Sequence, residues 1–448
     1  MKAIEFSYKD SCLVPESELK KIGEQLKPAI KKIQQALMQG YDSPYASLNL
    51  STDARMFDIV RAVIAQKKSL KPTMLIVIGI GGSNLGTMAV HEAVHGKFYN
   101  ESNPEITGSP FSQNGAKIKV YWADTVDADY INAIAMLMDA ELHKGNNILL
   151  NVVSKSGTTT ETIANFIILL NILKKHRPDD YGRYVVATTD KDSALWQLAQ
   201  QEHFVFLEIP KNVGGRYSVF SCVGLFPLGM LGVDIQDLRE GARSAMPEYT
   251  DANIFDNPAA LSAAILATYA HAGKNIHDTF LFSNQLESLG KWYRQLMGES
   301  IGKSDRQGSR IGITPTVSIG STDLHSVGQL YLGGPKDKCT TFVTIKSCAI
   351  DMNISYMQDY DQLAENIQDK QLTTIMHAII KGVQKAYQHE SLPYMTFEFP
   401  ESSVFYVGQF LQCKMLEIMY LGYLLEVNPF DQPNVELYKQ ETREILKI

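Results

Sequence analysis

The segment Leu149–Thr162, LLNVVSKSGTTTET, decides the fold, because a strand, a turn and the start of a helix follow one another directly. Ile148–Val153 is an almost continuous apolar run, which is typical of a strand buried on both faces. Hydroxyl-bearing residues and a glycine follow it, and the helical pattern of Thr160–Lys175 begins there. This order predicts one unit of a parallel α/β sheet.

The same alternation of strands and helices extends in both directions along the chain. In the first half, further strands are expected at Met74–Ile80, Ile118–Ala123, Tyr184–Thr188 and Phe204–Ile209. In the second half they are expected at Thr279–Ser283, Thr316–Ile319, Phe342–Ile345 and Met395–Phe399, with a helix-like segment at Leu286–Met297. We therefore predict an α/β protein with two doubly wound, parallel-rich domains flanked by helices.

The domain limits follow from this pattern. Residues 1–48 are expected to form an N-terminal helical arm that packs on the second domain, with a helical stretch at Ser17–Gly40 interrupted at Pro28. Residues 49–210 form the first, smaller α/β domain, and residues 211–448 form the larger second one, which ends in a C-terminal helix. Residues 100–117 and 302–312 are expected to be surface insertions.

Composition excludes several classes of function. The 448 residues carry 42 Lys and Arg against 49 Asp and Glu, a net charge of -7, which is not the basic footprint of a nucleic-acid-binding protein. The five cysteines form no CxxC pair, as expected in a reducing cytoplasm. No apolar run reaches the roughly 18 residues that span a bilayer, and the start lacks the apolar core of a signal peptide. We expect a soluble cytoplasmic protein without a membrane partner.

GIGGSNLG, Gly79–Gly86, is the first glycine-rich turn after a predicted strand. The dinucleotide fingerprint fails because Asn84 stands in place of its third glycine, and the Walker motif fails because Thr87 and Met88 follow where Lys and Ser or Thr are needed. What remains is a tight turn that presents Ser83 and backbone N–H groups at a helix start. Taken alone, the turn fits an anion site and simple turn geometry equally well.

The loop from Ser154 to Thr160 is a stronger candidate for an anion site. Its hydroxyl and N–H donors converge at a helix N-terminus, where the helix dipole favours negative charge. Such a loop suits a phosphate monoester, whereas a nucleoside triphosphate would need a metal-binding pattern that is missing. The alternative is an ordinary helix cap with several threonines, and the density of donors favours phosphate.

HEAVH, His91–His95, matches the HExxH pattern of zinc proteases. His95 is not followed by GxxH and no third ligand is obvious downstream, so a structural role for both histidines is favoured over zinc.

Four further motifs carry side chains that can do chemistry. Each is weak when taken alone, because an isolated Glu, Lys or His is more often structural or solvent-exposed than catalytic. They are VGGRYS with Arg216, MGESIGK with Glu299, GSTDLHS with His325, and FDQPNVELYK with Gln432 and Lys439.

Together these segments resemble the glucose-6-phosphate isomerase family, in whose order they occur between Gly79 and Lys439. The compact length is similar to that of the bacterial branch. Ser156 and Gly157 stand where animal enzymes have Thr and Phe, and Pro433 and Asn434 stand where they have Trp and Gly. The resemblance implies SIS-like sugar-isomerase domains, a hexose 6-phosphate substrate, a role in glycolysis and gluconeogenesis, and a homodimer in which the neighbouring subunit supplies the His.

The resemblance also implies residue roles. Glu299 matches the base that moves a proton between C2 and C1, a task that suits an ionised carboxylate. Arg216 matches the cation that stabilises the cis-enediolate. His325 and Lys439 match the ring-opening pair, and which is acid and which is base stays open. The matching substrate-binding positions are Gly82, Ser83, Ser154, Lys155, Ser156, Thr159, Gly215, Gln295 and Gln432.

Two alternatives remain beside glucose-6-phosphate isomerisation. One is an isomerase of another sugar phosphate, such as mannose 6-phosphate. The other is a sugar-phosphate sensor, which would need neither Glu299 nor Lys439. A hydride-shift route would require a divalent metal held by several carboxylates and His, and the sequence shows no such cluster, so we expect proton transfer with no cofactor and no catalytic metal.

Overall fold

A computed structural model describes residues 3–102, 117–360 and 362–447. The chain divides into two compact units, one formed by residues 1–31 with 244–448 and the other by residues 32–243. These limits describe where contacts are dense. The expected domain limits after residues 48 and 210 stay a prediction.

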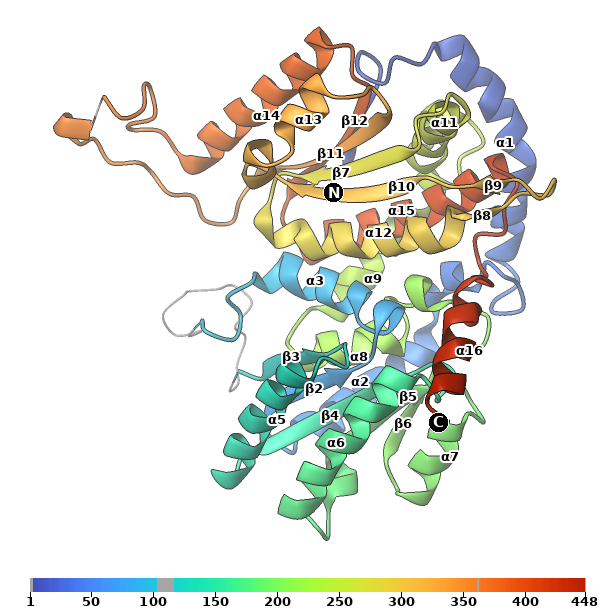
Figure 1. Ribbon diagram of the computed structural model, residues 1–448, viewed down its shortest axis with the longest axis vertical. Coiled ribbons are helices and arrows are strands. Elements are labelled where there is room, and N and C mark those ends of the chain that lie inside the picture. The colour runs from blue at the N-terminus through green and yellow to red at the C-terminus, as the bar shows by residue number, and fades with distance from the viewer. Residues whose placement is uncertain (1–2, 103–116, 361, 448) are drawn as a thin grey trace. The chain divides into compact units, whose positions relative to one another are not determined.

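The unit of residues 32–243 contains a five-stranded sheet in the order β3-β2-β4-β5-β6, in which all neighbours are parallel. Its strands are β2 (Pro72–Ile78), β3 (Lys119–Ala123), β4 (Asn147–Val153), β5 (Val185–Thr189) and β6 (Val205–Glu208). Its helices are α2 (Ala54–Lys68), α3 (Leu85–His95), α5 (Ala128–His143), α6 (Thr160–His176), α7 (Ala194–Gln201), α8 (Cys222–Met230) and α9 (Ile235–Ser244). Helices α5 and α6 pack on each other and on β4, and α2 and α8 lie on the opposite face (Figure 1).

The strand order of this unit reverses between β2 and β4. From β2 the chain first adds β3 on one side and then crosses to add β4 on the other side. Ile78 lies opposite Val152, so the loops that follow β2 and β4 leave the sheet at the same edge. Open α/β sheets bind ligands at such a point, beyond the carboxyl ends of the strands.

The unit of residues 1–31 and 244–448 contains a second sheet in the order β1-β12-β11-β7-β10, which is parallel except for β1. Its strands are β1 (Glu5–Ser7), β7 (Ile276–Leu281), β10 (Thr314–Ile319), β11 (Lys338–Ser347) and β12 (Tyr394–Glu401). A separate two-stranded hairpin joins β8 (Lys303–Ser304) to β9 (Arg310–Ile311). The helices are α1 (Glu16–Ala36), α10 (Met246–Tyr249), α11 (Pro258–His271), α12 (Glu287–Ile301), α13 (Gly328–Gly333), α14 (Leu372–His389), α15 (Val404–Leu424) and α16 (Val435–Ile445). The boundary between the two units falls within the last turns of α1, after residue 31.

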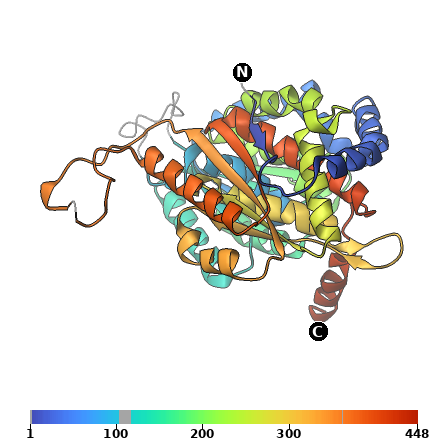
Figure 2. The same ribbon diagram turned by 90° about the horizontal axis from the view of Figure 1, so that it is seen from above.

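Both faces of this second sheet are covered. Helices α11, α12 and α15 pack together on one face, while an aromatic core that includes Phe280, Phe342 and Tyr387 fills the space under α13 and α14 on the other. The segment between β11 and α14 projects away from the rest of its unit in both views (Figures 1 and 2). Covered faces explain why the sequence shows continuous apolar runs rather than alternation.

All nine strands expected from the sequence are present in the structure, and the differences lie elsewhere. The expected interruption at Pro28 is wrong, because α1 continues through it. Pro28 is exposed, so the backbone carbonyl that loses its partner can bind water, while buried Leu26, Ala29 and Ile30 hold the helix on either side. Strand β1 and the β8–β9 hairpin are not predicted from the sequence, because they are too short to form an apolar run.

The two expected insertions have different outcomes. The loop at residues 302–312 contains the β8–β9 hairpin. Most of the insertion at residues 100–117 lies outside the described residues. Within the described part of the chain, no helix is both long and apolar enough to cross a membrane. All five cysteines are free thiols.

Candidate active site

The glycine turn after β2 is packed directly on the VGGRYS segment. A Cβ atom on Gly82 would lie 2.2 Å from the carbonyl carbon of Gly215 and 2.5 Å from the backbone nitrogen of Arg216. Ser218 Oγ donates hydrogen bonds to the carbonyl oxygens of Gly215 and Gly82, at 2.7 and 3.3 Å. Only glycine permits this approach, so two motifs far apart in the sequence form one structure at the carboxyl edge of the sheet.

The loop after β4 presents donors at the start of α6. The buried Ser154 hydroxyl lies 3.0 Å from that of Thr159, which is the N-cap residue and makes no side-chain cap bond to the helix. Gly157 has a φ of +71° and turns the loop tightly against Leu195. Ser156 is exposed. The Thr159 side chain thus does not cap the first N–H groups of this 17-residue helix, and these groups can donate hydrogen bonds to a bound phosphate.

Lys155 holds this loop to the segment that leads to Arg216. Its Nζ donates to the carbonyl oxygens of Lys211 and Val213, at 2.6 and 2.9 Å. Burial lowers the pKa of this ammonium group, and the neighbouring Asp190 opposes that effect. Burial also raises the pKa of Asp190 to about 6, and Glu208 adds to this shift. The Lys155 side chain is therefore structural in this arrangement, which leaves its backbone for phosphate.

Arg216 is almost completely buried, with 2% of its surface exposed. It lies in the short helix Gly215–Tyr217, and its guanidinium stands over the Tyr217 ring at 5.4 Å from the centroid. Burial fixes the guanidinium in place, which suits it to stabilise charge that develops on a bound oxygen.

In the other unit, Gln295 and Glu299 lie one turn apart on α12. Gln295 Nε2 donates to Glu299 Oε1 at 2.9 Å, and the neighbouring helix residues Trp292, Leu296 and Met297 are buried. Gly290 lets α12 lie close to the sheet, since a Cβ there would be 2.6 Å from Val317. The helix therefore presents the carboxylate with a defined orientation.

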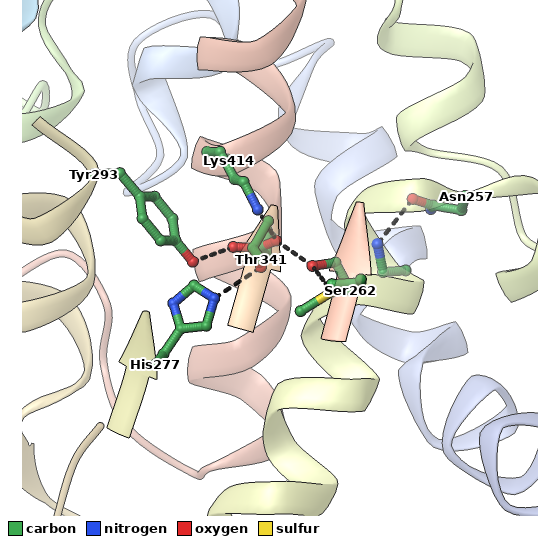
Figure 3. Close-up of polar contacts among 9 residues, drawn as sticks. Asn257, Ser262, His277, Tyr293, Thr341 and Lys414 are labelled. Atoms are coloured by element: carbon green, nitrogen blue, oxygen red, sulfur yellow. Dashed lines mark hydrogen bonds and ion pairs between the residues drawn. The ribbon is translucent and has the colours of Figure 1, made fainter. Parts of the chain in front are cut away.

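A buried polar network holds α12 against α15 (Figure 3). Lys414 and Glu417 of α15 form an ion pair at 2.6 Å, and both are fully buried. The Glu417 carboxylate also accepts hydrogen bonds from Tyr293 of α12 and from Ser262 of α11. Tyr293 precedes Gln295 by two residues, so this network sets the rotation of the helix that carries Glu299.

His277 extends the same network (Figure 3). Its Nε2 lies 2.8 Å from Thr341 Oγ1, and its ring packs against the edge of Tyr293. Burial, with the nearby Lys414 charge, lowers the pKa of His277 to about 3, so this histidine is neutral in the folded protein.

His325 lies at the other end of β10 from Glu299. A Cβ atom on Gly298, next to Glu299, would lie 3.8 Å from Pro315 near the start of β10, whereas His325 lies in the turn that follows the end of that strand at Ile319. Six residues of strand separate the two ends by about 17 Å. His325 is exposed, and the turn is held by Asp323, which accepts a bond from the Ile319 N–H at 2.7 Å. The unit thus does not bring His325 and Glu299 together.

The GESIGK and FDQPNVELYK motifs are joined by an ion pair. Lys303 is buried and donates to the Asp431 carboxylate at 2.6 Å. This contact places the segment that contains Gln432 beside the end of α12. Further along, Lys439 lies on α16 and pairs with Glu436 at 2.7 Å on the same helix. None of the residues of α16 is buried.

His91 and His95 of the HEAVH motif lie on α3 in a buried aromatic cluster. The ring of His91 packs on those of His95 and Tyr99, with centroids 5.2 and 4.8 Å apart. Burial lowers the pKa of His91 to about 3 and of His95 to about 4. Among the described residues these two belong to no group of three side chains placed to hold a metal ion.

Sequence reasoning missed several residues that shape the site. They are Ser218, Asp190, Lys303 with Asp431, and the buried set Ser262, Tyr293, Lys414 and Glu417. One signal was available, because a Lys and a Glu three residues apart are the charged residues in the otherwise uncharged α15. The other contacts join positions far apart in the sequence, which no local pattern reveals.

Two doubly wound α/β units, with donor-rich loops at the switch point of one of them, define the SIS-like sugar-isomerase class of fold. Among solved structures, a hypothetical protein from Thermus thermophilus is similar over 99% of both chains, with a TM-score of 0.85 and 29% identity. A glucose-6-phosphate isomerase from Chlamydia trachomatis matches all of this chain and 89% of its own, with a TM-score of 0.79 and 20% identity, which supports the fold.

The sequence identifies the family within this class. The family model described as phosphoglucose isomerase matches residues 54–448. The glucose-6-phosphate isomerase of Carboxydothermus hydrogenoformans is 34% identical over 83% of this chain and 78% of its own. That of Lactococcus lactis subsp. cremoris is 33% identical over 98% and 95%. The chain therefore belongs to the phosphoglucose isomerase family.

Proposed function

We propose that the protein interconverts D-glucose 6-phosphate and D-fructose 6-phosphate, a step of glycolysis and gluconeogenesis, in the cytoplasm. The observation that carries this proposal is the Gln295–Glu299 pair on α12, in a chain of the phosphoglucose isomerase family. A sensor of sugar phosphates would need the loop of Ser154 to Thr159 but no oriented carboxylate. The presence of both favours an enzyme over a binding protein.

The proposed reaction begins with binding of the phosphate. The phosphate is bound by the N–H groups at the start of α6 and by the Lys155 backbone. It also contacts the hydroxyls of Ser154, Ser156 and Thr159 and the turn at Gly82 and Ser83. Gly215 keeps that turn close to Arg216. This arrangement neutralises the phosphate with dipoles and hydroxyls, so Arg216 remains available for the reacting part of the sugar.

Ring opening and proton transfer follow. His325 and Lys439 exchange protons with the ring oxygen and the C1 hydroxyl. Glu299 then removes the proton from C2 and returns it to C1, while Arg216 stabilises the cis-enediolate that forms between these steps. Gln295 fixes the Glu299 carboxylate, and Gln432 contacts the sugar hydroxyls. Every step is a proton transfer, and none requires an added cofactor.

We also propose that the protein is a homodimer in which His325 acts in the active site of the partner. His325 and Glu299 lie at opposite ends of β10, and this separation supports a site to which two copies contribute. His325 is exposed beside an apolar groove lined by Leu324, Leu332 and Val383. The projecting segment before α14 exposes further large apolar side chains, namely Ile350, Met352, Tyr356, Met357, Tyr360 and Leu363. Such surface is typical of an interface.

Incubation with fructose 6-phosphate in heavy water, with a chelator present, tests the activity. Proton NMR should show glucose 6-phosphate with deuterium at C2, because the proton held by Glu299 exchanges with solvent. Absence of glucose 6-phosphate would refute the proposal. Parallel incubation with mannose 6-phosphate tests the alternative substrate, and a faster reaction there would reassign the enzyme.

A further inference from the structure

A cluster of two histidines and one aspartate lies at the far ends of α5 and α6. Asp139 and His143 are one turn apart on α5, which ends at His143, and His176 is the last residue of α6. Asp139 Oδ1 lies 2.8 Å from His176 Nε2, and Asp139 Oδ2 lies 3.3 Å from His143 Nδ1. One ligand atom from each side chain falls within 4.8 Å of the other two. Three donors from two helices therefore converge on one point.

The donor set selects a class of metal ion. Imidazole nitrogen with one carboxylate oxygen suits zinc and related first-row divalent ions, whereas Mg²⁺ and Ca²⁺ prefer oxygen ligands only. Three protein ligands leave a fourth tetrahedral position for water. We propose that Asp139, His143 and His176 form a surface site for Zn²⁺ that links the ends of α5 and α6.

The site is accessible and can adjust to a metal. The side chains of Asp139 and His143 are 47% and 67% exposed, and that of His176 is 20% exposed. The two rings stand nearly perpendicular, with centroids 4.5 Å apart. His143 Nδ1 also lies 2.9 Å from the Asp139 carbonyl oxygen, a contact that metal binding through Nδ1 would replace. Binding therefore exchanges these hydrogen bonds for bonds to the metal.

The site is separate from the proposed phosphate loop. That loop precedes the first residue of α6, and the cluster includes the last residue of this 17-residue helix, so about 25 Å lie between them. Bound Zn²⁺ should therefore stabilise the α5–α6 pair without changing turnover. This distinguishes the metal site from the proposed isomerase chemistry, which does not use the C-terminal end of α5 or of α6.

Calorimetric titration of the 448-residue chain with Zn²⁺ tests the proposal. Cys348 is exposed and can itself bind zinc, so all variants carry Cys348→Ser. We expect one equivalent to bind, and His143→Asn or His176→Asn to weaken that affinity by about tenfold or more. His389→Asn is the matched control, because His389 is an exposed histidine whose Nδ1 lies 3.0 Å from the Glu390 carboxylate and which belongs to no three-ligand group among the described residues. It should leave the affinity unchanged.

Co²⁺ provides an independent readout, because tetrahedral Co²⁺ absorbs visible light far more strongly than the hydrated ion. The parent should develop this absorption and His176→Asn should not. Zn²⁺ should also raise the melting temperature of the parent more than that of His143→Asn. Equal Zn²⁺ affinity of the parent and both histidine variants, or no binding to the parent, would overturn the proposal. Neither result would affect the assignment of Glu299.

Discussion

The two units use their parallel sheets in different ways. In residues 32–243 the candidate phosphate-binding groups lie where strands end, and tight packing of glycine turns brings them together. In the other unit Glu299 lies on the helix α12, oriented by a buried ionic network, and His325 is at the opposite end of β10. Anion binding can thus be built from loops and backbone, whereas the orientation of the Glu299 carboxylate depends on buried side chains that are distant in the sequence.

The first prediction tests whether Glu299 is the base. Glu299→Gln keeps the shape and the Gln295 contact but removes the charge, so turnover should fall by about 10²- to 10⁴-fold. Steady-state kinetics with both hexose phosphates measure this. Glu287→Gln on the same helix is the control and should retain nearly full turnover. Glu299→Gln should still bind inorganic phosphate with the affinity of the parent. If Glu299→Gln retains turnover, Glu299 is not the base of the reaction.

A second prediction concerns the distance between His325 and Glu299 within one unit. If the partner supplies His325, mixed dimers of His325→Ala and Glu299→Gln contain one intact site and one doubly altered site. Unfolding and refolding the two inactive variants together should restore about a quarter of the parental activity, for random pairing in a two-fold dimer. Refolding each variant alone is the control. No recovery, with dimers verified by light scattering, would place both residues in the same chain.

The third prediction addresses the network behind α12. Glu417→Gln leaves the Lys414 ammonium buried without its ionised partner, which should lower the free energy of unfolding by about 3 to 5 kcal/mol. Urea denaturation measures this loss. Glu436→Gln, which removes an exposed ion pair on α16, should not change the midpoint measurably. Equal midpoints for Glu417→Gln and the parent would show that the network does not hold α12.

The fourth prediction tests the close approach of glycine turns in the other unit. Gly82→Ala forces a methyl group into the Gly215 carbonyl, so stability should fall by about 1 to 3 kcal/mol and phosphate affinity should fall with it. Gly382→Ala in α14 has open space around its Cβ and should be neutral or slightly stabilising. If Gly82→Ala binds phosphate as tightly as the parent does, the turn at Gly82 takes no part in phosphate binding.

The smallest expected effect is a pH dependence at Asp190. Burial raises the pKa of Asp190 from 3.8 to about 6. Between these two pH values Asp190 is ionised in the unfolded chain but still protonated in the folded one. The free energy of unfolding of the parent therefore falls as the pH rises through this range. Asp190→Asn should be as stable as the parent near pH 4 and about 1 kcal/mol more stable near pH 8, allowing for the half-exposed carboxylate. Unfolding midpoints at the two pH values measure this, and a constant difference would contradict it.

Much of the fold could be predicted from local patterns. The buried parallel strands have continuous apolar runs, and the loops after β2 and β4 contain glycine and hydroxyl residues at helix starts. Strand β1 and the β8–β9 hairpin escaped prediction because pairing with distant residues stabilises them, and Pro28 was misjudged because tertiary packing overrides its helix-breaking tendency.

The sequence by itself determined the two α/β sheets, the loop at the start of α6 and the identity of the candidate residues, because strand, turn and helix signals act over a few residues. Only the tertiary structure decided that Gly82 packs on Gly215, that Lys414 and Glu417 orient α12, and that Glu299 and His325 lie at opposite ends of β10. These contacts join residues far apart in the chain, and the energies of burial and close packing that fix them arise only when the sheets and helices assemble.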